Sequence, residues 1–256
     1  MCYDSNARPP LPPIAGGTAD GKDIVLTASD GNRFAAYIAR SGNASGAQIV
    51  IYPDVRGLHQ FYKELALRFA EVGIDALAID YFGRTAGLGP RDDSFDYRTH
   101  TAQMQAPTFF NDVRAAVAYL REGSGANRPT FIVGFCMGGS LTVMSAAEDL
   151  GVAGGIPFYA GMSRSFPGGR GTALEVAKQA SIPLLALFGE ADQSIPVSTV
   201  QQFDAELDQA GVQHEVVIYP GATHSFFDRR YEEFADASAD AWKRMLAFVG
   251  SHKQKA

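Results

Sequence analysis

A cysteine stands between two glycines in the segment 134–138, which reads Gly-Phe-Cys-Met-Gly and follows the apolar run Thr-Phe-Ile-Val. Glycines two residues before and after a nucleophile are typical of a tight, strained turn between a strand and a helix, since larger side chains would collide there. Such a turn presents Cys136 at a helix N-terminus, where the positive end of the helix dipole favours a thiolate. The Met137 N–H points into the same space and can stabilise an oxyanion. The pattern therefore predicts that Cys136 is a nucleophile, although most lone cysteines are buried structural residues.

A thiol nucleophile needs a base, and the base needs a carboxylate that orients it. Asp192 follows the apolar run 183–188, and His224 follows the next predicted strand, 215–219. Because neighbouring parallel strands end at the same edge of a sheet, we expect the two side chains within hydrogen-bonding reach. Two alternatives stay open: Glu190 as the acid, and Asp192 as a helix cap. The remaining histidines lie at a strand start, in the tail, and on loops or helix starts: His214, His252, His59 and His100.

The elements that must position these residues alternate along the chain. A hairpin is expected over 24–38, with further strands at 48–52, 75–79, 131–133, 154–159, 183–188 and 215–219 and helices at 62–72, 109–120, 197–210 and 231–249. This order predicts an α/β protein with a mostly parallel central sheet and helices on both faces. We expect one domain over residues 1–256, with residues 1–22 as an irregular arm rich in Pro, Gly and Ala. The loop 87–105 is open to several interpretations: a cap, a partner contact, or an exposed segment.

Composition excludes several classes of partner. The chain has 256 residues, a net charge of −6 and no Lys/Arg cluster, so we expect neither nucleic acid nor a membrane as partner. No apolar run approaches the roughly 20 residues of a membrane span. No signal peptide is visible, so a cytoplasmic location is expected, with Cys2 and Cys136 as free thiols. Neither a metal nor a cofactor is expected, because zinc-binding and Walker patterns are missing from the sequence. The sequence gives no indication of the oligomeric state.

The chain resembles the dienelactone hydrolase family (carboxymethylenebutenolidase-like), whose members have the α/β-hydrolase fold. Four motifs carry the resemblance: 52–57 (Tyr-Pro-Asp-Val-Arg-Gly), 80–84 (Asp-Tyr-Phe-Gly-Arg), the cysteine turn, and 221–226 (Gly-Ala-Thr-His-Ser-Phe). The chain order nucleophile, acid, histidine is also that of α/β-hydrolases. The resemblance implies a Cys136–His224–Asp192 triad that hydrolyses an ester bond.

The resemblance assigns two more roles after the strand 48–52. The family has an acidic residue there that modulates the thiol, usually Glu, and the matching residue is Asp54. Its side chain is one methylene shorter, and it can alternatively cap the turn after the strand. The N–H of Val55 would be the second oxyanion donor, beside that of Met137.

Substrate-binding residues follow from the same motifs. Arg84 matches an arginine that binds the substrate carboxylate, a role that suits the fixed fork of a guanidinium; the alternative is a surface arginine. A second family arginine lies four residues after the histidine, where this chain has Asp228, followed by Arg229 and Arg230. We take Arg229 as the substitute, with Arg230 as the rival.

Aromatic residues near these motifs can line an apolar wall for a substrate ring. They are Tyr81 and Phe226, with Phe82 and Phe227 beside them. Aromatic side chains at such positions can equally belong to the core.

The expected function is hydrolysis of a small carboxylate-bearing lactone, dienelactone to maleylacetate, through an acyl-enzyme. One alternative is a general small-ester or thioester hydrolase of the same family, for which Asp54 and the shifted arginines argue. Another, of a different class, is a non-catalytic or redox-sensing thiol protein on this fold. The complete set of triad residues argues against the latter.

Overall fold

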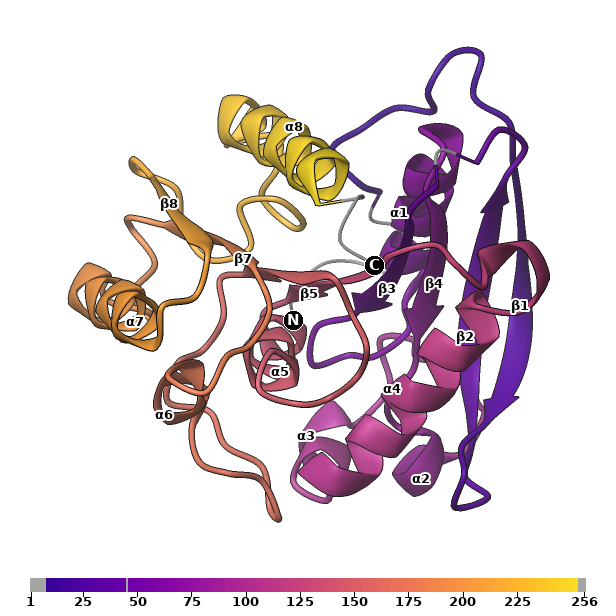
Figure 1. The fold of residues 1–256 in the computed structure, drawn as a ribbon, viewed down its shortest axis with the longest axis horizontal. Helices are drawn as coiled ribbons and strands as arrows, with labels where there is room; N and C mark the ends of the chain where they lie inside the picture. Colours follow the sequence, from indigo (N-terminus) through magenta and orange to yellow (C-terminus); the bar gives the residue numbers. More distant parts are fainter. Residues whose placement is uncertain (1–7, 45, 253–256) are drawn as a thin grey trace.

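The protein is built around one twisted, mostly parallel sheet (Figure 1). The computed structural model describes residues 8–44 and 46–252. Eight strands follow the order β1-β2-β4-β3-β5-β6-β7-β8. They are β1 (Ala19–Thr27), β2 (Arg33–Ser41), β3 (Gln48–Tyr52), β4 (Asp75–Ile79), β5 (Thr130–Phe135), β6 (Gly154–Phe158), β7 (Leu184–Gly189) and β8 (His214–Tyr219). β2 pairs antiparallel with β1 and with β4, and all other pairs are parallel. The predicted α/β class is confirmed.

Helices cover both faces of the sheet (Figure 1). They are α1 (Gln60–Glu71), α2 (Gly83–Ala86), α3 (Tyr97–Thr101), α4 (Ala106–Leu120), α5 (Met137–Ser145), α6 (Ala173–Ala177), α7 (Val197–Ala210) and α8 (Ala235–Ser251). α1 and α8 share one face, where the rings of Phe69 and Trp242 lie 4.9 Å apart. α4 and α5 share the other, where Tyr52 of β3 packs on Phe109 and its hydroxyl lies 3.2 Å from that of Ser145.

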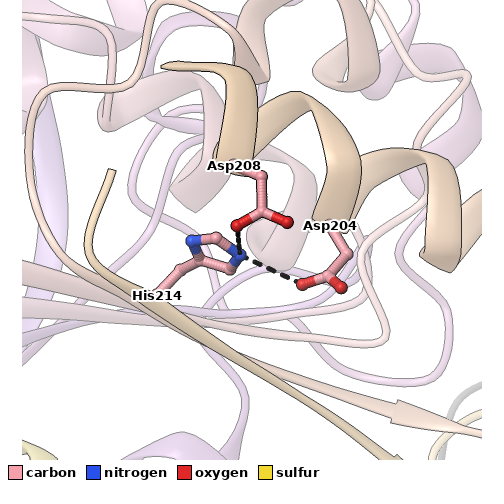
Figure 2. Close-up of side chains that lie close together, drawn as sticks. All are labelled: Asp204, Asp208 and His214. Atoms are coloured by element: carbon pink, nitrogen blue, oxygen red, sulfur yellow. Dashed lines mark hydrogen bonds and ion pairs between the residues drawn. The ribbon is translucent and has the colours of Figure 1, made fainter. Parts of the chain in front are cut away.

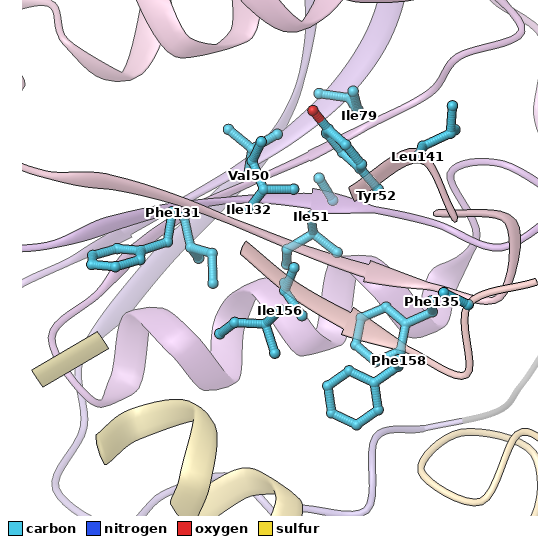
Figure 3. Close-up of a cluster of buried hydrophobic side chains, with 14 of the residues drawn as sticks. Val50, Ile51, Tyr52, Ile79, Phe131, Ile132, Phe135, Leu141, Ile156 and Phe158 are labelled. Atoms are coloured by element: carbon cyan, nitrogen blue, oxygen red, sulfur yellow. The ribbon is translucent and has the colours of Figure 1, made fainter. Parts of the chain in front are cut away.

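The central strands are buried on both faces, which explains their continuous apolar sequences. Every residue of β3 to β7 is buried. Figure 3 shows the resulting cluster, in which Val50, Ile132 and Ile156 come from three neighbouring strands. Because β3 to β8 run parallel, their carboxyl ends meet at one edge, and the loops that leave this edge carry the predicted triad.

Some predicted boundaries were wrong. The arm ends at residue 18, because β1 begins at Ala19, and its first seven residues, Cys2 among them, lie outside the described residues. The loop expected over 87–105 contains α3, and α2 lies directly before it. The last helix begins at Ala235 rather than at residue 231, because turns occupy 224–234. The strand 214–219 and the helix 197–210 otherwise follow the prediction closely.

The passage from β5 to α5 is the tightest crossing in the sheet. A Cβ on Gly138 would lie 2.3 Å from the carbonyl oxygens of both Tyr52 and Pro53, and a Cβ on Gly134 would lie 2.1 Å from the Gly138 oxygen. These contacts are with backbone, which cannot move aside as a flexible side chain would. Only glycine therefore lets α5 start so close to the end of β3.

Gly138→Ala should destabilise the fold by about 1–3 kcal/mol, because the new methyl group overpacks a rigid crossing. Chemical denaturation would measure the loss. The matched control is Gly250→Ala in α8, where a Cβ has open space around it and the helix propensity of alanine is favourable. Equal stability of the two variants would contradict this account of the crossing.

Candidate active site

Cys136 lies in the turn between β5 and α5, as the glycine pattern predicted. Its backbone has φ 55° and ψ −110°, a left-handed conformation rare outside glycine. The surrounding structure holds this conformation: the Cys136 N–H donates to the Phe158 oxygen at 3.1 Å, and the Cys136 oxygen accepts from Ser140 N–H at 3.1 Å. The side chain is half-buried and is not disulfide-bonded within the described residues. Cys136 is therefore presented at the edge where the parallel strands end.

His224 and Asp192 come together as expected from neighbouring strand ends. Their side chains are joined by a 2.6 Å hydrogen bond between Nδ1 of the histidine and Oδ2 of the aspartate. The other carboxylate oxygen of Asp192 accepts from the N–H and the hydroxyl of Ser194, at 2.9 and 2.6 Å. The rival acid, Glu190, instead accepts from the Gly221 N–H at 2.9 Å. The Asp192 carboxylate is nearly inaccessible, whereas His224 keeps 31% of its side chain exposed.

The electrostatics of this pair favour a protonated imidazole. Burial alone would lower the pKa of His224, but hydrogen bonds to Asp192 and Cys136, together with their negative charge, outweigh it and raise the pKa to about 10. Burial likewise opposes ionisation of Asp192, yet the hydrogen bonds from His224 and Ser194 hold its pKa below the ordinary value. Asp192 and Cys136 therefore both favour the protonated form of the imidazole.

The two backbone N–H groups expected to receive an oxyanion lie after the ends of β3 and β5. Neither the Val55 nor the Met137 N–H donates a hydrogen bond to any part of the chain that the structure describes. Val55 follows β3, next to the strand that ends in the cysteine turn. Met137 begins α5, so its N–H also carries the positive end of the helix dipole.

Asp54 is fully buried beside this region and has the capping role that sequence reasoning offered as the alternative. Its Oδ1 accepts from the Arg56 N–H at 2.9 Å. Its backbone oxygen accepts from the Tyr81 hydroxyl at 2.6 Å. Burial, then the charges of Asp54 and Cys136, raise the pKa of Tyr81 well above the usual range. Asp54, Tyr81 and Cys136 therefore share one electrostatic environment.

Three predicted substrate-binding residues have structural partners instead. Arg84 forms a two-pronged ion pair with Asp112, at 2.7 and 3.1 Å, and a second pair with Asp30 at 2.9 Å. Its guanidinium is thereby engaged, which differs from the expected role as a carboxylate clamp. Tyr81 is 3% exposed and Phe226 is fully buried, so both belong to the core rather than to a pocket wall.

The two arginines after His224 share a cavity with the histidine. Together with Asp192 and His224, Arg229 and Arg230 line an open cavity of about 470 Å³. The side chain of Arg230 has two partners in the protein: it forms an ion pair with Glu233 and donates a hydrogen bond to the Thr223 hydroxyl at 3.1 Å. Arg229 and Arg230 thus lie on the same cavity as His224, and Cys136 is not among the residues that line it.

Sequence reasoning missed the contacts that hold the 87–105 segment to the body. Arg91 forms a buried ion pair with Asp80, the first residue of the second motif, at 2.7 Å. Arg56 pairs with Asp93 at 2.6 Å. An arginine eleven residues after a buried aspartate gives no local signal, because only the fold brings the two together.

A second group of polar side chains lies away from the triad, between α7 and β8 (Figure 2). Nε2 of His214 lies 3.0 Å from Asp204 Oδ1 and 3.8 Å from Asp208 Oδ1, while Nδ1 lies 2.6 Å from the Val212 oxygen. The two aspartates are one helical turn apart, a spacing that the sequence already contains. The geometry is that of a histidine bridging two exposed carboxylates and the end of a helix.

None of the described helices combines the length and apolar character needed to cross a membrane.

Comparison with known proteins agrees with this geometry. The model of the dienelactone hydrolase family matches residues 34–253. A carboxymethylenebutenolidase from Rhodococcus opacus is 28% identical, over 97% of this chain and 96% of its own. A Salmonella typhimurium protein named "Putative carboxymethylenebutenolidase" is also 28% identical, over 97% and 95%. The crystal structure titled as a "Putative Dienelactone Hydrolase" from Klebsiella pneumoniae has a TM-score of 0.79 and 25% identity, and covers 91% of this chain and 99% of its own.

The match to the family model extends over most of the chain and includes the cysteine turn and the loops that hold Asp192 and His224. The protein belongs to the dienelactone hydrolase family and is a carboxylic ester hydrolase with the α/β-hydrolase fold.

Proposed function

We propose that this hydrolase cleaves small ester and lactone bonds with a Cys136–His224–Asp192 triad, through an acyl-enzyme. The observation that carries the proposal is the hydrogen-bonded histidine: it joins Asp192 at 2.6 Å and also bonds the Cys136 side chain. Nucleophile, base and orienting acid therefore stand in the order that nucleophilic catalysis requires. The redox-thiol alternative explains neither the buried carboxylate nor the oriented imidazole.

In the first half-reaction the Cys136 thiolate attacks the carbonyl carbon and forms a C–S bond. The negative charge moves to the carbonyl oxygen, which the Val55 and Met137 N–H groups accept. Collapse breaks the C–O bond, and the leaving oxygen takes a proton from the His224 imidazolium, which leaves the imidazole neutral. In the second, neutral His224 takes a proton from water, whose oxygen attacks the thioester, and the C–S bond breaks. The thiolate and the imidazolium are then restored.

The substrate we propose is a small lactone that bears a carboxylate, with dienelactone and its product maleylacetate as the specific case. Arg229 supports this choice, because it lines the cavity next to His224, and guanidinium groups recognise carboxylates. A thiolate is a good leaving group, so the triad suits activated esters better than amides.

A general small-ester or thioester hydrolase is the second candidate. The engagement of Arg84 by Asp112 and Asp30 favours it, since one expected carboxylate clamp is occupied. In that case a carboxylate on the substrate brings no advantage.

Cys136→Ala should lower hydrolysis of both cis- and trans-dienelactone by on the order of 10³-fold or more, because the nucleophile is lost. The assay follows loss of dienelactone absorbance with purified protein, beside a short aryl acetate. Turnover of the aryl acetate alone, abolished in the variant, would keep the triad and favour the general esterase. Unchanged turnover in the variant would refute the nucleophile.

Asp192→Asn should lower the pKa of His224 from about 10 toward its ordinary value of 6.5. A raised pKa stabilises the fold fully below pH 6.5, and that contribution is lost as the pH rises through about 10. The difference in Tm between wild type and variant should therefore be largest near pH 6.5. It should shrink as the pH approaches about 10. Thermal melts over this range test it. Glu190→Gln is the matched control; a pH-independent gap for Asp192→Asn would contradict the assignment.

Arg229→Met should raise KM for the carboxylate-bearing lactone about 10-fold or more, the effect of losing a charge-assisted hydrogen bond. KM for a neutral aryl acetate should change little. Steady-state kinetics with both substrates measures the difference within one variant. Equal effects on the two substrates would remove Arg229 from substrate recognition.

A further inference from the structure

Backbone strain is concentrated around one side chain. Among the described residues, three other than glycine have positive φ: Cys136 at 55°, Tyr159 at 33° and Ser225 at 62°. All three adjoin His224. Cys136 is hydrogen-bonded to it, the Tyr159 ring lies 4.9 Å from the imidazole, and Ser225 follows it in the chain. Conformations of this kind are strained and persist only where the surroundings enforce them.

Asp228 links two of these strained residues. The Tyr159 hydroxyl donates to its Oδ2 at 2.6 Å, the Ser225 side chain donates to the same carboxylate, and the Arg229 N–H donates to Oδ1. The aspartate is 1% exposed. Its position is the one where the family resemblance expects an arginine, so its charge is the reverse of the expected one. A buried carboxylate with three donors is an anchor for the loop that carries His224.

The charge of Asp228 also reaches the histidine. Groups that face His224 are Asp192 from the loop after β7, Cys136 from the turn before α5, Tyr159 from the end of β6, and Asp228 from its own loop. The guanidinium groups of Arg229 and Arg230 line the cavity on the open side.

Of the groups on the buried side, Tyr159 stays neutral. Burial, and then the negative charge of Asp228, raise its pKa well above the usual range. Burial raises the pKa of Asp228 to about 6, while its hydrogen bonds and the nearby His224 oppose that rise. Asp228 is therefore largely ionised above neutral pH and adds a second negative charge near the imidazole.

We propose that Asp228 is a second positioning acid for His224, which holds Tyr159 and Ser225 against the imidazole and, by its charge, stabilises the imidazolium that accompanies the Cys136 thiolate. The proposal concerns the pair Cys136–His224 whatever ester it cleaves, and it rests on the proposed function only in taking that pair as reactive. Asp228 touches no reacting atom and acts through the histidine.

The test measures alkylation of Cys136 by iodoacetamide as a function of pH, in a Cys2→Ser background so that one thiol reacts. Asp228→Asn keeps the shape and an oxygen acceptor for Tyr159 but removes the charge. We expect the midpoint of the alkylation profile to move up by roughly one pH unit, because the imidazolium is less stable. Tyr159→Phe should move it in the same direction by less, because Asp228 then loses a hydrogen bond that favours its ionised form.

Asp240→Asn is the matched control. Asp240 lies in α8 and accepts a hydrogen bond from the Tyr219 hydroxyl at 2.9 Å, as Asp228 does from the Tyr159 hydroxyl. It should leave the profile unchanged. A lower Tm for Asp228→Asn with an unchanged alkylation profile would reduce Asp228 to a structural anchor and overturn the proposal. If Asp228→Asn does not fold, an unchanged profile for Tyr159→Phe has the same consequence.

Alkylation does not depend on ester turnover, so the two proposals fail separately. A shifted profile in a protein that hydrolyses no lactone or aryl ester would uphold the positioning acid and reject the proposed function. Rapid lactone turnover with an unchanged alkylation profile would uphold the proposed function and reject the positioning acid.

Discussion

The close approach of β5 and α5 to the end of β3 is the constraint on which the site depends. Gly138 faces the carbonyl oxygens of Tyr52 and Pro53, so the helix can begin within van der Waals reach of the neighbouring strand. Cys136 lies in this turn and has a positive φ of 55°. Val55 follows the end of β3 and Met137 begins α5, so their backbones belong to the same crossing.

Around this turn the protein gathers negative charge and then balances it with one imidazole. Asp192, Asp228 and Cys136 lie around His224, and the pKa of the histidine is raised to about 10 in spite of burial. The interaction of these groups with His224 is electrostatic, so its strength depends on the distances between them. The packing of the surrounding side chains fixes those distances. Tyr159 provides part of it, since its ring lies on the imidazole while its hydroxyl anchors Asp228.

The arginines near the site have different roles in this fold. Arg84 and Arg91 neutralise buried aspartates, Asp112 and Asp80, and so stabilise the loops beside the site. Arg229 lies on the cavity next to His224, where charge faces solvent. Arg84 and Arg91 therefore contribute to the fold, whereas Arg229 belongs to the cavity surface beside the histidine.

The sequence by itself determined the strand-turn-helix around Cys136 and the order of strands and helices, because glycine spacing and apolar periodicity are local signals. It also indicated Asp192 and His224, since parallel strands must end at one edge. Only the tertiary structure decided which acid bonds the histidine: Asp192 turns inward, whereas Glu190, two residues earlier, caps Gly221. The partners of Arg84, the burial of Phe226 and the link from Asp228 to Tyr159 were likewise beyond the sequence. They join residues 28 to 69 positions apart, and no local pattern encodes which distant side chains a folded core brings into contact.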